Sequence, residues 1–305
     1  MTAVAPPAST PIASADAGSE PHVPAGARLR RILRKVPVNV TLAVLAALWI
    51  IPALGLLITS FRPVNDYLVS GWWQGLIHPT TLTMSNYKNV IQNAGIGDAL
   101  VTTVLITVPT TLLVVIIAAL AGYSLVFQSW PGRDWVFLGI VALLVVPLQM
   151  ALLPISSLFG NLGLYGNIPG VVIFHTAFGL PFAIFLMRNF YTGIPKDLLE
   201  AARIDGASEW VMFLKIVLPL GRPALASLAI FEFLWVWNDL LVALVFLAPS
   251  SHQPLTVAIF SQLRQFGSNI DIIAVASFIS LIVPLIVFLA FQRQFVRGVL
   301  AGAVK

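Results

Sequence analysis

Long apolar stretches separated by short polar segments dominate the pattern of this chain. Six stretches approach or exceed the roughly 20 residues that a helix needs to cross a bilayer, and each is apolar on most of its faces. They cover about residues 38–60, 99–123, 136–158, 168–187, 220–247 and 272–292. The pattern predicts an all-α polytopic membrane protein with six transmembrane helices.

Prolines interrupt most of the predicted helices, at Pro52, Pro109, Pro147, Pro181 and Pro284. A proline removes one backbone hydrogen bond and crowds the preceding turn. Inside a membrane bundle, neighbouring helices can satisfy the freed carbonyl groups. We therefore expect kinks at these positions rather than helix ends.

Composition narrows the class of protein further. The 305 residues are 58% hydrophobic and 10% charged, with a net charge of +5 and no cysteine. So few charges are incompatible with an ordinary soluble enzyme, and the basic residues gather at the ends of apolar segments, where membrane topology accounts for them without a nucleic-acid partner. The missing thiols exclude disulfides and cysteine chemistry.

The distribution of basic residues predicts the orientation. If both termini are cytoplasmic, fourteen of the seventeen Lys and Arg residues lie inside, and only Arg62, Lys88 and Arg264 lie outside. This asymmetry follows the positive-inside rule. Residues 61–98 then form an outer loop, and residues 188–219 form a cytoplasmic one.

Two domains are expected. Residues 1–35 are rich in Ala, Pro, Ser and Thr and end in a basic cluster, which is typical of a disordered tail. Residues 36–305 form the transmembrane domain, which ends in a cytoplasmic tail at 293–305.

The cytoplasmic loop carries an unusual share of the charges. Pro195 suits the first turn of a helix, Glu200 is favoured near its N-terminus, and Gly206 is a natural stop. We expect Glu200, Arg203 and Asp205 to form ion pairs at the rim of a docking partner's cleft. A helix, a glycine and a second helix at this surface predict docking into a groove of another protein.

The spacing of this loop carries a resemblance. Glu200-Ala201-Ala202, three residues, Gly206, nine residues and Ile216-x-Leu218-Pro219 match in full the EAA motif of permease subunits of binding-protein-dependent ABC importers. We call residues 195–219 the EAA loop.

Other features resemble the carbohydrate branch of that family, whose familiar member is the maltose permease subunit MalG. They are Ala121, Tyr123 and Gly132 around the second helix, the segment Trp237-Asn238-Asp239, and the C-terminal residues 292–305. The last residues, 295–305, are most similar to the α-glucoside type.

The resemblance implies a MetI-like permease domain over 36–305, in a bacterial cytoplasmic membrane. It also implies a second homologous permease subunit, two ATPase subunits that bind ATP and magnesium, and an extracytoplasmic sugar-binding protein. This chain would then bind no cofactor and catalyse no reaction, and it has no Gly-x4-Gly-Lys-Ser/Thr stretch for ATP phosphates. The ATPase contact is implied for Glu200, Ala201, Ala202, Asp205, Gly206, Ile216, Leu218 and Pro219.

Polar residues in the predicted helices are candidates for a sugar pathway, because intramembrane ionisable groups usually face a cavity or a polar partner. Glu232 and Asp239 lie seven positions apart, on one face of a continuous helix. Asn238 and Gln149 are further candidates. A structural hydrogen bond for Glu232 and a helix-end role for Asp239 remain open alternatives.

Two further side chains have simpler interpretations. His175 has no acidic companion at useful spacing, so we expect a buried hydrogen-bonding histidine, and Trp237 is expected to be an interfacial anchor. An ion-coupled secondary transporter is the alternative function, with Glu232 as its coupling group. An intramembrane hydrolase would need a Ser or Asp partner for His175.

Overall fold

The computed structural model describes residues 25–67, 69–92, 95–247, 250–263 and 270–303, of which 25–35 and 293–303 are described by their backbone alone. Every regular element in these ranges is helical. The predicted all-α class is therefore confirmed. Five helices are long and apolar enough to cross a membrane within the described part, or six if one bent pair counts as a single span.

The first helix, α1 (Ala25–Ser60), is longer than the predicted segment 38–60. Its backbone is already helical through the basic cluster that we placed in the tail. Residues 1–24 of that predicted tail lie outside the described residues. The chain divides into two compact units, 1–52 and 53–305, and α1 crosses the boundary between them.

Short helices build the segment between α1 and the second long helix. They are α2 (Val64–Tyr67), α3 (Gln74–Ile77), the 3-10 turn η1 (Pro79–Thr81) and α4 (Ser85–Gln92). Elements this short cannot be stable alone. Side-chain hydrogen bonds must therefore hold the segment in shape.

Arg62 is the centre of those hydrogen bonds and is only 2% exposed. Its guanidinium donates to the carbonyl oxygens of Asp66, Ser70 and Gly71 at 2.9–3.0 Å, and to the hydroxyl of Ser70. Asn86 of α4 donates in turn to the carbonyl oxygen of Arg62, at 2.7 Å. The hydrogen bonds of this one buried guanidinium and its backbone carbonyl thus connect the parts of the segment.

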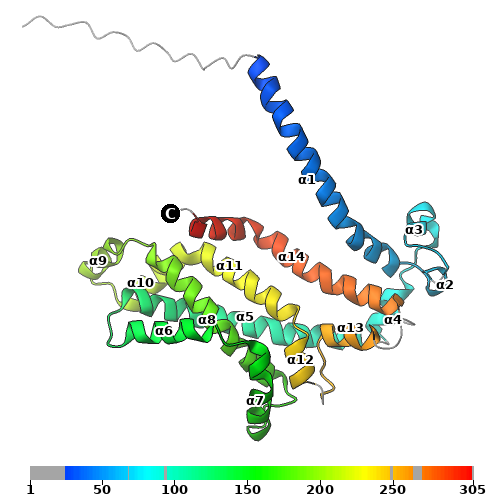
Figure 1. Ribbon diagram of the computed structural model, residues 1–305. Helices are drawn as coiled ribbons and strands as arrows, with labels where there is room; N and C mark the ends of the chain where they lie inside the picture. Colours follow the sequence, from blue (N-terminus) through cyan, green and yellow to red (C-terminus); the bar gives the residue numbers. More distant parts are fainter. Residues whose placement is uncertain (1–24, 68, 93–94, 248–249, 264–269, 304–305) are drawn as a thin grey trace, which may run out of the picture. The chain divides into compact units, whose positions relative to one another are not determined.

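The long helices α5 (Ile96–Phe127) and α8 (Ile168–Thr192) pack against each other (Figure 1). Their backbones come close at Gly122, where an added Cβ would lie 3.0 Å from Cβ of Met187 and 3.2 Å from the backbone nitrogen of Arg188. Small residues at such crossings are typical of membrane helices, because lipid provides no hydrophobic force to press helices together.

The predicted third helix, 136–158, is broken. The structure has α6 (Arg133–Leu143) and α7 (Leu148–Asn161), bent by 101° relative to each other. Pro147, immediately before α7, has an extended backbone with ψ 127°. Proline disfavours a helical conformation in the residue before it, and Val146 is not helical. The chain therefore breaks here, whereas we expected a kink.

The predicted fifth helix, 220–247, is broken as well. It consists of α11 (Leu218–Trp237) and the short α12 (Leu241–Phe246). Residues 238–240 between them are not helical. Glu232 therefore lies within α11, while Asp239 lies in the break, so the two carboxylates are not on one face of a continuous helix.

The last two helices are α13 (Leu255–Leu263) and α14 (Ile270–Ala303). They pack against each other, and α14 also packs against α11. The backbone of α14 continues through most of the segment that we expected to be a tail, 293–305, and includes Gly298 and Gly302. The last two residues lie outside the described part.

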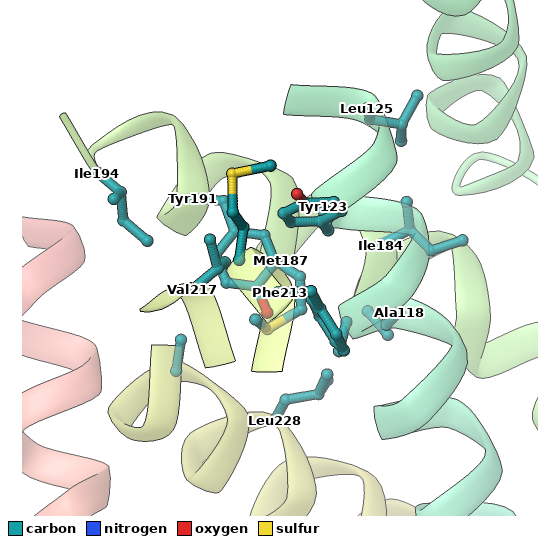
Figure 2. Close-up of a cluster of buried hydrophobic side chains, with 14 of the residues drawn as sticks. Ala118, Tyr123, Leu125, Ile184, Met187, Tyr191, Ile194, Phe213, Val217 and Leu228 are labelled. Carbon is teal, nitrogen blue, oxygen red and sulfur yellow. The ribbon is translucent and has the colours of Figure 1, made fainter. Parts of the chain in front are cut away.

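A cluster of buried apolar side chains joins α5, α8 and the start of α11 (Figure 2). Tyr123 comes from α5, Met187 and Tyr191 come from α8, and Phe213 and Val217 come from the EAA loop. Each is at most 6% exposed. The EAA loop is therefore rooted in the helix bundle by packing.

Candidate functional site

The first half of the EAA loop is the helix α9 (Asp197–Ile204). Gly206 follows with φ +81°, its N–H donates to the carbonyl of Arg203 at 3.0 Å, and the N–H of Ala207 donates to the carbonyl of Ala202 at 2.9 Å. This pair of bonds is the Schellman arrangement, which needs a left-handed residue and so favours glycine. The spacing between Ala202 and Gly206 in the motif is therefore explained by these two backbone hydrogen bonds, which end the helix.

The second half starts a new helix at once. The Ser208 hydroxyl accepts a hydrogen bond from the N–H of Val211 at 3.4 Å, as an N-cap of α10 (Glu209–Met212). The π-helical turn η2 (Phe213–Val217) then leads directly into α11. Pro219 near the start of α11 cannot donate a backbone bond and crowds the preceding turn, and a wider π turn relieves that conflict.

The surface of the EAA loop is mixed. Leu199 is 1% exposed and holds α9 to the bundle, whereas Ile204 is 87% exposed and Trp210 is 62% exposed. The residues of the motif follow the same division. Glu200, Ala201, Asp205 and Gly206 are exposed, and Ala202, Ile216, Leu218 and Pro219 are half-buried.

One ion pair lies within the EAA loop itself. Arg203 pairs with Glu209, at 3.1 Å between Nη2 and Oε1. The carboxylates of Glu200 and Asp205 form no ion pair with any residue that the structure describes. Both carboxylates are exposed, so their ion pairs with a docking partner stay a prediction.

Tyr123 also contacts Glu209, and its hydroxyl donates to Oε2 at 2.6 Å. The two residues are 86 positions apart. Sequence reasoning noted Tyr123 only as part of the resemblance and gave Glu209 no role. The only signal for Glu209 in the sequence is its charge within a polar loop, and a charge alone does not identify a partner.

The second candidate site lies among the membrane helices, and Glu232 is the most buried of its predicted pathway residues. Glu232 is 4% exposed, and its Oε1 has no hydrogen-bond partner among the described residues. The carboxylate lies against Gly179 of α8, where an added Cβ would come within 2.6 Å of Oε1. In this conformation Glu232 is enclosed between α8 and α11.

Asp239 has a defined structural role at the break in the fifth span. Its carboxylate accepts from the N–H groups of Val242 and Ala243, at 3.3 and 3.1 Å, and so caps α12. Its Oδ2 also lies 3.5 Å from Nε2 of His175, which is 1% exposed. The expectation that His175 has no acidic companion is wrong, because Asp239 lies beside it and comes from the break in the fifth span.

The remaining candidates differ in accessibility. Asn238 and Gln149 are both exposed, and Asn238 donates to the carbonyl of Leu234 at 2.7 Å. Trp237 is 2% exposed, and its indole nitrogen donates to the carbonyl of Ser280 in α14 at 3.1 Å. The expected interfacial anchor is therefore a buried link between two helices.

The cavity beside His175 and Asp239 has a volume of about 10 Å³. It is lined by Thr103 and Thr107 of α5 in addition to that pair. This volume accommodates at most one water molecule and excludes a sugar ring. Among the described residues, no group of three or more His, Asp or Glu side chains is placed to hold a metal ion.

Comparisons with known proteins place this geometry in a family. Residues 97–300 match the model of the binding-protein-dependent transport system inner membrane component. The chain is 44% identical over 276 residues to the osmoprotective compounds uptake permease protein GgtD of Synechocystis sp., covering 89% of this chain and 93% of that protein. It is 46% identical over 257 residues to the alpha-glucoside transport system permease protein AglG of Rhizobium meliloti, and the alignment covers 81% of this chain and 68% of that protein.

A solved structure shares the fold. The crystal structure of a bacterial ABC transporter involved in the import of the acidic polysaccharide alginate aligns with a TM-score of 0.70 at 20% identity. The alignment covers 90% of this chain and 100% of that chain.

Removing the carboxylate of Asp239 should loosen the break in the fifth span. We expect Asp239→Ala to destabilise the protein by about 0.5–2 kcal/mol, because the first amides of α12 lose their cap. The measurement is the melting temperature of the purified protein in detergent. Asn238→Ala is the control, since its exposed side chain bonds the carbonyl of Leu234 in α11 and not the amides of α12. Equal melting temperatures for both variants would refute the capping role.

Proposed function

Because the chain belongs to the binding-protein-dependent transport system inner membrane components, we propose that it is a permease subunit of an ATP-driven sugar importer. The observation that carries this proposal is the EAA loop. It exposes Ile204 and Trp210 on the protein surface, on a short helical hairpin that packs against the helix bundle. Such a hairpin is suited to a groove on another subunit.

The cargo is a di- or oligosaccharide, and a glucoside in particular. The support is the similarity over most of the chain to a permease protein of alpha-glucoside transport and to one of osmoprotective compound uptake. This chain forms half of the translocation pathway. A second, homologous permease subunit forms the other half.

ATP and magnesium are bound by two separate ATPase subunits, and this chain binds no cofactor. The EAA loop transmits their motion through Glu200, Ala201, Ala202, Asp205, Gly206, Ile216, Leu218 and Pro219. Open space around Gly206, where an added Cβ would meet nothing within 4 Å, leaves room for close approach of a partner backbone.

The sugar pathway follows the polar residues of the fifth span, together with Gln149 of the third span. Asn238 and Gln149 are accessible in this conformation, and Asp239 is partly so. Glu232 reaches a sugar only if α8 and α11 separate at Gly179, as they would in an alternating-access cycle. An unpaired polar group costs about 1–3 kcal/mol when buried, so a dehydrated sugar needs such partners.

The protein lies in the bacterial cytoplasmic membrane with both termini in the cytoplasm. An extracytoplasmic sugar-binding protein delivers the cargo on the opposite side, where the outer loop, residues 61–98, lies. The support is the excess of basic residues on one side of the spans.

Transport of a labelled glucoside by cells that express the complete importer tests the function. Uptake of radiolabelled trehalose, sucrose and maltose should stop when ATP is depleted and should persist when uncouplers dissipate the ion gradients. Uptake of any of these sugars that is lost with uncouplers while ATP is maintained would indicate ion coupling instead. Absence of uptake for all three sugars with an assembled, ATP-hydrolysing complex would refute the glucoside assignment.

Substitution of Gly206 tests the role of the EAA loop. Gly206→Trp should release the ATPase subunits or separate hydrolysis from uptake, because a large side chain enters the contact. Gly163→Trp is the matched control, since Gly163 also has a positive φ, +69°, and open space around it but lies outside the loop. Equal retention of the ATPase subunits by both variants in co-purification would refute the contact.

Cysteine labelling tests the orientation in a chain that has no cysteine of its own. Val69→Cys and Asp134→Cys both place the thiol at a largely exposed position. In intact cells an impermeant maleimide should label the first and not the second, and permeabilised cells should label both. The reverse pattern would overturn the orientation.

Two substitutions of Glu232 separate transport from structure. Glu232→Gln keeps the shape and the hydrogen-bonding capacity, whereas Glu232→Leu removes both the charge and the polar atoms. If Glu232 lines the pathway, uptake at equal complex abundance should fall severalfold further for Leu than for Gln. Normal uptake by both variants, or a loss confined to assembly with the second permease, would make Glu232 a structural group.

A further inference from the structure

We propose that Tyr123, Arg203 and Glu209 are positioning residues that fasten the EAA loop to α5, so that a displacement of α9 moves α5 with it. We call these three side chains, together with the backbone carbonyl of Phe127, the α5 clamp. The inference rests on the proposed function, because only a loop that receives force from another subunit needs such a fastening.

Four hydrogen bonds form the clamp. Nε and Nη2 of Arg203 donate to Oε1 of Glu209 at 3.2 and 3.1 Å, and Nη2 also donates to the carbonyl of Phe127 at 3.2 Å. The hydroxyl of Tyr123 donates to Oε2 of Glu209 at 2.6 Å. Arg203 precedes Gly206 and Glu209 follows it, so the ion pair closes the base of the turn. Tyr123 and Phe127 then attach that base to the end of α5.

Burial differs along the clamp, and this difference identifies its critical member. The side chains of Arg203 and Glu209 are 41% and 45% exposed, so their ion pair alone contributes little. Tyr123 is 4% exposed, and its ring packs against Phe127 and Phe213 with centroids 5.5 and 5.3 Å apart. A rigid, buried phenol that donates to a charged acceptor is therefore the anchor of the clamp.

The path beyond the clamp leads across the bundle. α5 is 32 residues long, packs against both α8 and α11, and carries Thr103 toward its other end. The hydroxyl of Thr103 accepts the N–H of Leu255, at the start of α13, at 2.8 Å. A displacement of α9 that moves Tyr123 therefore also moves α5, which has hydrogen bonds to other elements near both of its ends.

Removal of one hydroxyl tests the clamp with little disturbance of packing. Tyr123→Phe keeps the ring and deletes the bond to Glu209. A hydrogen bond to a charged acceptor shifts a two-state equilibrium by roughly tenfold or more, so the loop should populate detached positions. Tyr191→Phe is the matched control, because Tyr191 is a fully buried tyrosine of the same cluster whose hydroxyl has no partner among the described residues.

The first measurement is a distance between spin labels and needs no sugar. Lys196→Cys at the start of α9 and Leu120→Cys on α5 accept the labels, in the assembled complex with cysteine-free partner subunits. We expect a narrow distance distribution in the wild type and in Tyr191→Phe, and a distribution at least about twice as broad in Tyr123→Phe. Equal widths for the two tyrosine variants would overturn the clamp.

The second measurement is the number of ATP molecules hydrolysed per sugar imported. Tyr123→Phe should raise this ratio severalfold at equal complex abundance. In a Glu209→Ala background the same substitution should add nothing, because the carboxylate that accepts the Tyr123 bond is already absent. A merely structural role predicts lower complex abundance with an unchanged ratio. If the wild-type complex neither hydrolyses ATP nor imports a glucoside, the proposed function fails, whereas an unchanged ratio in Tyr123→Phe beside a functional wild type refutes the clamp alone.

Discussion

The close approach of α5 and α8 at Gly122 is the contact on which the rest of the bundle depends. In lipid, apolar side chains gain nothing by leaving their surroundings, so helices associate through close packing and a few polar bonds. Here an added Cβ would lie 3.0 Å from Met187. The buried cluster that roots the EAA loop includes side chains from both of these helices, and it keeps its shape only while their separation is preserved.

Features that depend on neighbouring residues could be predicted from the sequence. The apolar stretches predicted the spans because their length is set by bilayer thickness. The helical hairpin of the EAA loop could be predicted from Pro195, Glu200 and Gly206, since caps and glycine stops act within one turn. The structure adds the reason for the spacing, which is the pair of backbone bonds that Gly206 and Ala207 donate.

Features that depend on contacts between helices could not be predicted. His175 pairs with Asp239 where the fifth span breaks after Trp237. The polar residues Asn238 and Asp239 left a helix end open as one alternative, but their spacing from His175 did not indicate a contact with another span. The 101° bend before α7 was expected only as a kink at Pro147. Tyr123 and Glu209 meet because α5 and α10 pack against a common cluster, and such a contact has no signature in the spacing of residues.

Arg62 has a consequence for the environment that its segment tolerates. The side-chain hydrogen bonds that fix its guanidinium go to three carbonyl oxygens and one hydroxyl, and none goes to a carboxylate. Peptide carbonyls and serine hydroxyls do not ionise in the range where proteins are stable, and guanidinium stays protonated there. Bonds of this kind are not lost on acidification, and they lack the opposite charge whose attraction salt would screen. The hydrogen bonds that hold the segment between α1 and α5 therefore need no ionised carboxylate, and added salt should weaken them little.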